Sequence, residues 1–163
     1  MSSVHWPILR TCLAAPLRPL IIDDRRTWRG IDLLVGAANL AAEIDRRCRT
    51  RTVGLLLPTG GGFAMAALAG WMTGRVVVPL NYLLKPEELQ YVIDDCETDL
   101  VLTAGPLLDH LGWKPTVSTL LPIDQLSLGG FPEPRWPAGA SSDDLATLLY
   151  TSGTSGRPKG VML

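Results

Sequence analysis

The sequence predicts an α/β fold in which a mostly parallel sheet is flanked by helices. Short apolar runs alternate with longer segments of helical periodicity along most of the chain. Hydrophobic residues make up 47% and charged residues 19% of the 163 residues, which is the composition of a globular protein. Repeated strand, helix, strand units of this length imply parallel pairing and right-handed crossovers, with helices covering the sheet.

The first predicted elements are a short hairpin and a long amphipathic helix. Leu20 to Asp23 and Arg26 to Trp28 flank a charged turn, so we expect them to pair as two short strands. Gly30 to Arg47 follows as a helix with apolar residues recurring on one face. These residues are Leu33, Ala37, Leu40, Ala41 and Ile44. The arginines at its C-terminal end suit the helix dipole, which favours a solvated helix end over a phosphate site.

An uncharged stretch raises the question of a membrane segment. Thr52 to Gly74 has no charged side chain over 23 residues, which is long enough to cross a bilayer. Pro58 and the glycines Gly60 to Gly62 interrupt it, and such residues end one element and begin another. We therefore predict a buried strand from Thr52 to Leu57, a helix from Phe63 to Thr73, and no integral membrane segment.

The rest of the α/β pattern continues in the same alternation. A strand is predicted from Arg75 to Pro79 and a helix from Lys85 to Asp95, where a proline and two glutamates suit the first turn. Leu100 to Thr103 is the next strand, Gly105 to Leu111 a short helix and Val117 to Ile123 a further strand. Residues 127–142 are rich in Gly, Pro and Ser, which indicates an exposed connection.

Residues 150–161 form a predicted phosphate loop. Its glycines and hydroxyls present many N–H and O–H donors, which suit phosphate oxygens, and Lys159 adds a cation. The apolar runs Leu145 to Tyr150 and Val161 to Leu163 are expected to be two buried strands that carry the loop. Its spacing differs from a Walker loop, because the lysine is followed by Gly160 instead of a hydroxyl. An ordinary Gly/Ser/Thr hairpin with a solvated lysine is the alternative interpretation.

The same stretch resembles a known signature. Asp143 to Ala146 and Leu149 to Leu163 are similar to the phosphate-loop motif of the AMP-forming adenylating enzymes, which include acyl-CoA synthetases, luciferases and peptide-synthetase adenylation domains. The Asp-Asp-Leu-Ala and Val-Met-Leu flanks are more similar to acyl-CoA synthetases. Arg26 to Trp28, Gly74 to Asn81 and Pro86 to Leu89 also occur in the family's order. The resemblance implies that residues 1–163 are the N-terminal, incomplete part of the large AMP-binding domain.

This resemblance implies a two-step ligase reaction. A carboxylic acid reacts with MgATP to give an acyl adenylate, and a thiol, for which coenzyme A is expected, then takes the acyl group. ATP, Mg²⁺ and coenzyme A are thus the implied cofactors. The implied ligands of the β- and γ-phosphates are Thr151, Ser152, Gly153, Thr154, Ser155 and Gly156. Lys159 would supply positive charge to the departing pyrophosphate.

The same resemblance implies that other functional motifs of the family are not contained in these 163 residues. The family's adenine, metal, acid and catalytic-lysine motifs occur later than Leu163, so no residue here is assigned as catalytic or as a metal ligand. We expect the chain alone to behave as a truncated ligase, aggregation-prone and without turnover. The remainder of such an enzyme is a candidate partner.

The net charge and the cysteine pattern argue against a nucleic-acid-binding protein and a zinc protein. Fifteen basic and sixteen acidic residues give a formal net charge of −1, so no nucleic-acid partner is expected. Cys12, Cys48 and Cys96 are widely spaced and outside any zinc pattern, which predicts reduced thiols in a cytoplasmic protein.

Two other functions remain open. The first is a non-catalytic module that binds ATP or phosphate for sensing or docking. The second is a fragment of a dinucleotide-binding oxidoreductase that uses the turn Gly60 to Gly62. That second match is incomplete, because Met65 stands at the third small position and no acidic residue follows the next strand.

Overall fold

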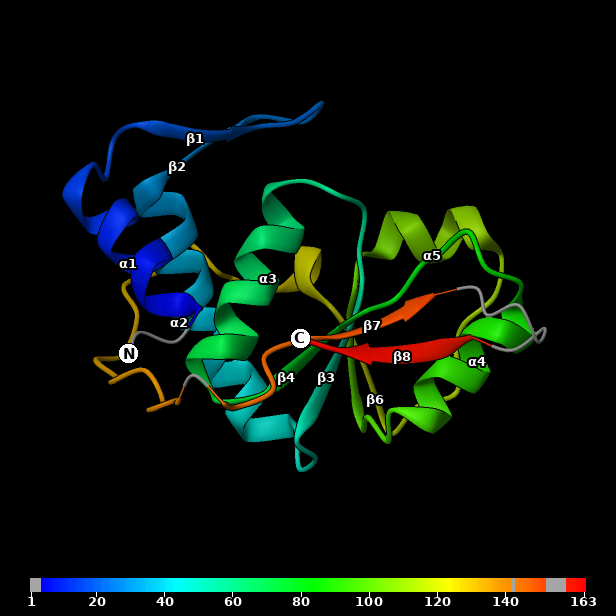
Figure 1. Cartoon of the computed structure of the whole chain (residues 1–163). Coiled ribbons are helices and arrows are strands. Elements are labelled where there is room, and N and C mark those ends of the chain that lie inside the picture. Colours follow the sequence, from blue (N-terminus) through cyan, green and yellow to red (C-terminus); the bar gives the residue numbers. More distant parts are fainter. Residues whose placement is uncertain (1–3, 142, 152–157) are drawn as a thin grey trace.

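The centre of the molecule is a four-stranded parallel sheet in the order β4-β3-β5-β6 (Figure 1). The structure, a computed structural model, describes residues 4–141, 143–151 and 158–163. The strands are β3 (Thr52–Leu56), β4 (Val76–Pro79), β5 (Leu100–Thr103) and β6 (Thr119–Pro122). All three strand pairs are parallel, which confirms the predicted fold class.

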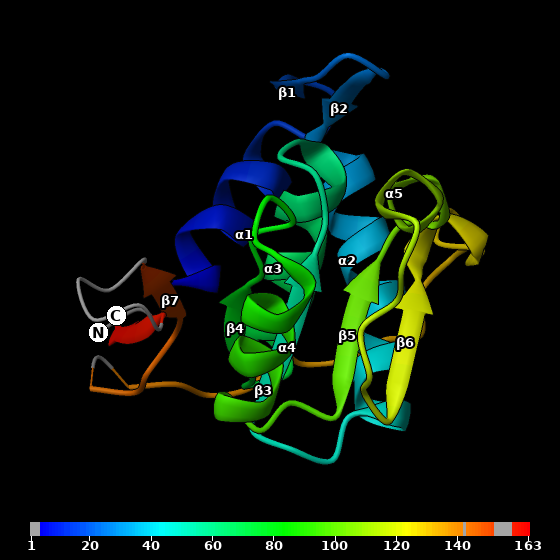
Figure 2. The same ribbon diagram turned by 90° about the vertical axis from the view of Figure 1, so that its right-hand side faces the viewer.

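Helices cover both faces of this sheet. On one face lie α2 (Gly30–Arg47) and α3 (Gly61–Met72), with α1 (His5–Ala14) packed outside them. On the other face lie α4 (Pro86–Asp95) and α5 (Gly105–Leu111), which stand in front of the sheet in Figure 2. The layers follow from the crossovers, because each helix connects parallel strands over one face.

Two antiparallel hairpins lie outside the sheet. The predicted first hairpin is confirmed as β1 (Pro19–Ile22) and β2 (Thr27–Arg29). The second consists of β7 (Leu148–Thr151) and β8 (Lys159–Met162). A short 3-10 helix, η1 (Ile123–Gln125), follows β6 and shortens the strand predicted from Val117 to Ile123.

The sequence did not lead us to predict α1. Its buried residues His5, Leu9 and Cys12 stand four and three residues apart, which is the spacing of one helical face. Pro7 falls in the first turn, where a missing N–H costs no helical hydrogen bond. The signal was therefore present, but it covers fewer than three turns and has no acidic residue in its first turn.

The uncharged stretch is two buried elements of this core. Residues Val53 to Leu56 of β3 are buried, and so are most residues of α3. Small side chains let α3 lie between the sheet and α2: a Cβ on Gly70 would lie 2.8 Å from Cγ2 of Val77, and one on Gly36 2.2 Å from Sδ of Met65. None of the helices in the described part of the chain is long and apolar enough to cross a membrane.

The connection after η1 runs along α2 and α3. It contains no helix or strand among its described residues, 127–141, as predicted. The side-chain amide of Asn39 donates to the carbonyls of Leu128 (3.1 Å) and Gly130 (2.8 Å), and Ala138 N–H donates to Met72 O at 2.8 Å. These hydrogen bonds hold the connection against the helices and lead the chain toward β7.

Candidate phosphate-binding site

The β7–β8 hairpin holds the two ends of the predicted phosphate loop together. In its register Thr151 lies opposite Lys159, and Tyr150 lies opposite Gly160. Thr151 and Lys159 are both exposed and occupy the end of the hairpin where the chain leaves β7 and returns to β8. The other predicted phosphate ligands, Ser152, Gly153, Thr154, Ser155 and Gly156, lie outside the described residues, so their roles stay predictions.

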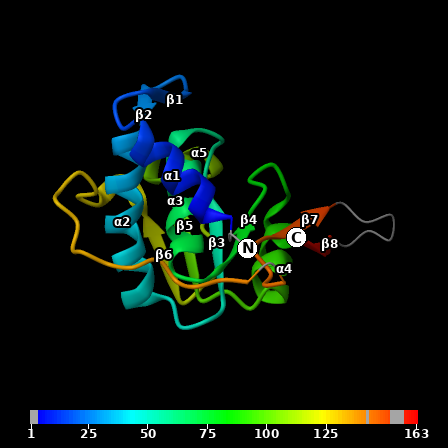
Figure 3. The same ribbon diagram turned by 60° about the vertical axis from the view of Figure 1, so that its left-hand side comes forward.

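The base of the hairpin is attached to the outer strand of the sheet. The carbonyl of Ala146 accepts hydrogen bonds from the backbone N–H of Val77 (3.0 Å) and from Nε1 of Trp71 (2.9 Å). Thr147 forms a parallel bridge with Val77 of β4. Figure 3 shows β7 and β8 beside β4 and α4, directed away from the rest of the molecule.

The expectation that two buried strands carry the loop is wrong. Every residue of β8 is exposed, and β7 is only half buried from Leu148 to Tyr150. Within the described residues, β8 pairs with β7 alone, so no element covers its other edge. Apolar composition predicted burial, but Met162 and Leu163 remain 74% and 62% exposed. Exposed edges of this kind favour association with another chain.

A tyrosine attaches the loop end of the hairpin to α4. The hydroxyl of Tyr150 donates to Oδ2 of Asp95 at 2.5 Å. Burial raises the pKa of Tyr150, and the hydrogen bond and negative charge of Asp95 raise it further, so the phenol stays protonated and keeps donating. Opposite it, a Cβ on Gly160 would lie 3.4 Å from Cζ of Tyr150 and 3.0 Å from Cδ1 of Leu148. Gly160 therefore leaves space for both side chains.

Lys159 places a positive charge at the loop end. Lys159 is exposed and, among the residues that the structure describes, forms no ion pair. An unpaired ammonium beside a Gly- and hydroxyl-rich segment suits an anion with several oxygens. The described part of the hairpin's loop end thus has the features of a candidate phosphate site.

A second hollow lies at the carboxyl edge of the sheet. A cavity of about 750 Å³ opens between the β1–β2 turn, the first halves of α2 and α3, and the segment after β6. From β3 the chain continues to β4 on one side, whereas β5 and β6 lie on the other side of β3. Such a reversal of strand order is the switch point at which α/β sheets often bind ligands. Its wall includes Asp23, Trp28, Phe63, Asp124 and Leu128.

The helix N-termini at this edge already have anionic partners within the chain. Oδ2 of Asp23 accepts from Gly61 N–H of α3 (3.0 Å) and from Nε1 of Trp28 (2.7 Å), while its Oδ1 accepts from two N–H groups of the β1–β2 turn. The Gly61 N–H is the largest cause that lowers the pKa of Asp23. Asp124 likewise accepts from Gly105 N–H at the start of α5 (2.8 Å). An incoming phosphate would have to displace these carboxylates.

Backbone conformation and close packing explain the glycines of the turn before α3. Gly60 has φ +155°, in the region that favours glycine, and a Cβ there would lie 2.8 Å from Oδ2 of Asp23. A Cβ on Gly61 would lie 2.2 to 2.3 Å from ring atoms of Trp28. Close packing of the first hairpin on α3 therefore accounts for Gly60 and Gly61, the glycines considered above for a dinucleotide site. The Asp23 carboxylate occupies the position where the pyrophosphate of a dinucleotide would bind.

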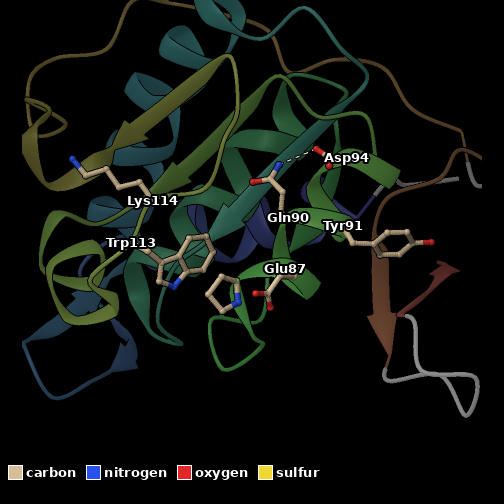
Figure 4. A pocket seen from close by; sticks show the side chains of 7 residues that line it. Glu87, Gln90, Tyr91, Asp94, Trp113 and Lys114 are labelled. Carbon is tan, nitrogen blue, oxygen red and sulfur yellow. Dashed lines mark hydrogen bonds between the residues drawn. The ribbon is translucent and has the colours of Figure 1, made fainter.

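A shallower cavity of about 460 Å³ lies beside α4 (Figure 4). It is lined by Pro86, Glu87, Gln90, Tyr91, Asp94, Trp113 and Lys114. The amide of Gln90 is fully engaged, because Nε2 donates to Thr116 O and to Asp94, and Oε1 accepts from Thr116 N–H. We assign this polar cluster to fixing the chain after α5 and not to a ligand.

The His, Cys, Asp and Glu side chains of the described residues do not form a metal centre. In the described ranges no group of three or more His, Cys, Asp and Glu side chains is arranged to hold a metal ion. Cys12, Cys48 and Cys96 are free and buried, and burial raises the pKa of Cys96 to about 11. These thiols are therefore protonated at neutral pH.

Comparison with known proteins identifies the family of this chain. The family model described as "AMP-binding enzyme" matches residues 10–163. The chain belongs to the AMP-binding enzyme family. The resemblance found in residues 143–163 and in the opening region is thus confirmed, and adenylate-forming enzymes have the fold described above.

Curated relatives of this AMP-binding chain include CoA ligases. It is 32% identical to the mitochondrial malonate–CoA ligase of Homo sapiens, over 96% of this chain and 29% of the relative. It is 36% identical to the 2-succinylbenzoate–CoA ligase of Bacillus licheniformis, over 68% of this chain and 23% of the relative. The chain therefore spans less than a third of these two relatives.

Solved structures of the family have the same fold. VinN in complex with 3-methylaspartate has a TM-score of 0.82 and 27% identity, over 99% of this chain and 47% of that protein. The o-succinylbenzoate CoA synthetase of Bacillus subtilis in complex with AMP has a TM-score of 0.75 and 27% identity, over 94% of this chain and 40% of the synthetase.

We predict opposite effects for alanine at two adjacent glycines of α3. Gly61→Ala should lower the free energy of unfolding by about 1 to 3 kcal/mol, because its Cβ collides with the indole of Trp28. Gly62→Ala is the matched control, since the nearest atom to its Cβ is 3.8 Å away. It should be neutral or stabilising by up to about 1 kcal/mol. Denaturant unfolding followed by tryptophan fluorescence measures both; equal effects would refute the packing role of Gly61.

Asp23 should make stability depend on pH. Its folded-state pKa lies below the unfolded value of about 4, so its stabilisation is present above that pH and is lost as the pH falls through it. The Tm of Asp23→Asn should be below that of the wild type at pH 7, and the gap should narrow at pH 3. The exposed neighbour Asp24→Asn serves as control. A difference in Tm between wild type and Asp23→Asn that does not change with pH would contradict this role.

Proposed function

We propose that the β7–β8 hairpin, with the segment that joins its strands, binds the triphosphate of ATP in an AMP-forming acid–thiol ligase. The observation that carries this proposal is the register of the hairpin, which sets Thr151 and Lys159 opposite each other at its exposed end. Membership of the AMP-binding family supports the nucleotide. The contacts of Ala146 attach the base of the hairpin to the sheet, which supplies part of the support that such a site needs.

The proposed chemistry has two steps. A carboxylate oxygen of the acid attacks the α-phosphate of MgATP, the bond to the bridging oxygen breaks, and pyrophosphate leaves with that bond's electron pair. The sulfur of a thiol then attacks the acyl carbon, and AMP leaves. Mg²⁺ arrives with the nucleotide as part of the substrate.

The residues of this chain act on the leaving group. The Lys159 ammonium lies where it would neutralise charge that develops on pyrophosphate, and the hydroxyls and N–H groups of the loop would donate to the β- and γ-oxygens. The proposed donors are Thr151, Ser152, Gly153, Thr154, Ser155 and Gly156. Fixed donors of this kind mainly position the nucleotide, because phosphoryl and adenylyl transfers need little covalent participation by the protein.

The names of the relatives support coenzyme A as the thiol. Malonate, 2-succinylbenzoate and sulfoacetate are the acids named for three CoA ligases at 32 to 36% identity. The acid proposed here is accordingly a carboxylic acid, and the thiol is coenzyme A. Tyrocidine synthase 1, 29% identical over 99% of this chain, is also a relative, which keeps a carrier-protein thiol as the competing choice. A cytoplasmic location remains a prediction based on the free cysteines.

A non-catalytic phosphate-binding module is the second candidate, favoured by the exposure of Lys159 opposite Thr151 in the hairpin register. Affinity separates the two. A ligase segment that depends on an adenine pocket elsewhere should bind MgATP with a Kd of about 1 mM or weaker, whereas a dedicated sensor should reach about 1 μM. Isothermal titration of the 163-residue chain with MgATP measures this difference.

We predict that Lys159→Ala weakens binding of inorganic tripolyphosphate by the chain about tenfold, because one charge-assisted contact is lost. Lys114→Ala is the control, since Lys114 is also an exposed lysine but lies beside α4. Chemical-shift titration in ¹⁵N-labelled chain gives both affinities and the residues that respond. Shifts centred on Lys114 or at the start of α3, with those of Lys159 unchanged, would refute the proposed site.

A further inference from the structure

The loop end of the phosphate hairpin is connected to the body of the protein by one side-chain hydrogen bond in the described residues. Oη of Tyr150 donates to Oδ2 of Asp95 at 2.5 Å, across 55 positions of sequence. Tyr150 is the residue directly before Thr151, the first proposed phosphate ligand. The contact therefore joins α4 to the place where the loop begins.

Leu148 and Tyr150 also pack against the core, but the other hydrogen bonds from the hairpin to the body of the protein lie at its opposite end. Ala146, which bonds to Val77 and Trp71, is four residues before Tyr150, or about 13 Å along an extended strand. Beyond that base, β8 pairs only with β7 within the described chain. A two-stranded hairpin that is hydrogen-bonded to a sheet only at its base is a weak support. The position of Thr151 and Lys159 thus depends on what holds Tyr150.

Asp95 is an unfavourable residue for the helix that carries it. It is the last residue of α4, where the helix dipole disfavours negative charge, and the last turn contains no basic residue. Its neighbour Asp94 accepts a hydrogen bond from Gln90 of the same helix. The helix dipole therefore does not favour a carboxylate at position 95, which instead accepts hydrogen bonds from Tyr91 of its own helix and from Tyr150 of the hairpin.

Two phenols converge on this carboxylate. Tyr91, one turn earlier in α4, donates to Oδ1 of Asp95 at 3.3 Å, while Tyr150 takes Oδ2. In Figure 4 the side chain of Tyr91 points toward β7, away from Trp113 and Lys114. The carboxylate is thus oriented from its own helix and presents one oxygen to the hairpin. Gly160 leaves the space that the ring of Tyr150 needs.

We propose that Asp95 is a positioning residue for ATP binding, which acts through Tyr150 to fix the loop end of the β7–β8 hairpin. The inference rests on the proposed function, because it concerns the geometry of the same site. Asp95 does not touch the nucleotide. Its hydrogen bond limits the freedom of Thr151 and Lys159 before binding, so less conformational entropy is lost when the phosphate chain binds.

The test compares tripolyphosphate affinity among variants of the 163-residue chain. Tyr150→Phe removes one hydroxyl and should weaken binding about fivefold, and Asp95→Ala should have the same effect. The double variant should be no weaker than either single variant, because both changes break one contact. Asp94→Ala is the matched control: it removes the neighbouring carboxylate of α4, which accepts a hydrogen bond from Gln90 of the same helix, and it should leave affinity unchanged.

A second measurement separates positioning from a general loss of structure. In Tyr150→Phe, ¹⁵N relaxation should show greater motion of the Thr151 and Lys159 amides. The Val77 amide, which donates at the base of the hairpin, should keep its protection from hydrogen exchange. Loss of protection at Val77 as well would show general unfolding of the hairpin and overturn the inference.

The outcomes distinguish the inference from the proposed function. If Lys159→Ala weakens tripolyphosphate binding while Tyr150→Phe changes neither affinity nor amide motion, the site stands and the role of Asp95 is refuted. If Lys159→Ala has no effect, the proposed site fails and the positioning role fails with it. Weaker binding in Tyr150→Phe and Asp95→Ala, without additivity and with Asp94→Ala unchanged, supports Asp95 as the positioning residue.

Discussion

The parallel pairing of β3 with both β4 and β5 is the constraint on which the rest of the structure depends. It places β3 at the centre of the sheet, so α2 and α3 must cover one face and α4 and α5 the other. It also leaves β4 at an edge. That edge receives Thr147 at Val77, so the β7–β8 hairpin is located by the order of the strands.

The same arrangement explains why the carboxyl edge of the sheet is not the site that we propose. Asp23 and Asp124 accept hydrogen bonds from the first N–H groups of α3 and α5, so these helix ends are already neutralised within the chain. Lys159 has no such partner among the described residues. Positive charge without a partner is therefore found on the hairpin, where the sequence motif also lies.

Much of the fold was predictable because its signals are local. The α2 range was predicted without error, since its apolar residues repeat on one face from Leu33 to Ile44, and Pro58 with the following glycines separated β3 from α3. Burial of β8 was predicted wrongly, because apolar composition does not show whether another element covers a strand. The roles of Asp23 and Asp95 could not be predicted, since their partners lie 38 and 55 residues away in sequence.

The sequence by itself determined the class of the fold, its family motif and the residue types available to a phosphate, because periodicity and turn chemistry act over a few residues. Tertiary structure alone decided that Thr151 faces Lys159, that Trp28 requires a glycine at position 61, and that Asp95 meets Tyr150. The last two depend on contacts between segments distant in the chain. Such contacts are fixed only when the sheet and its helices have packed.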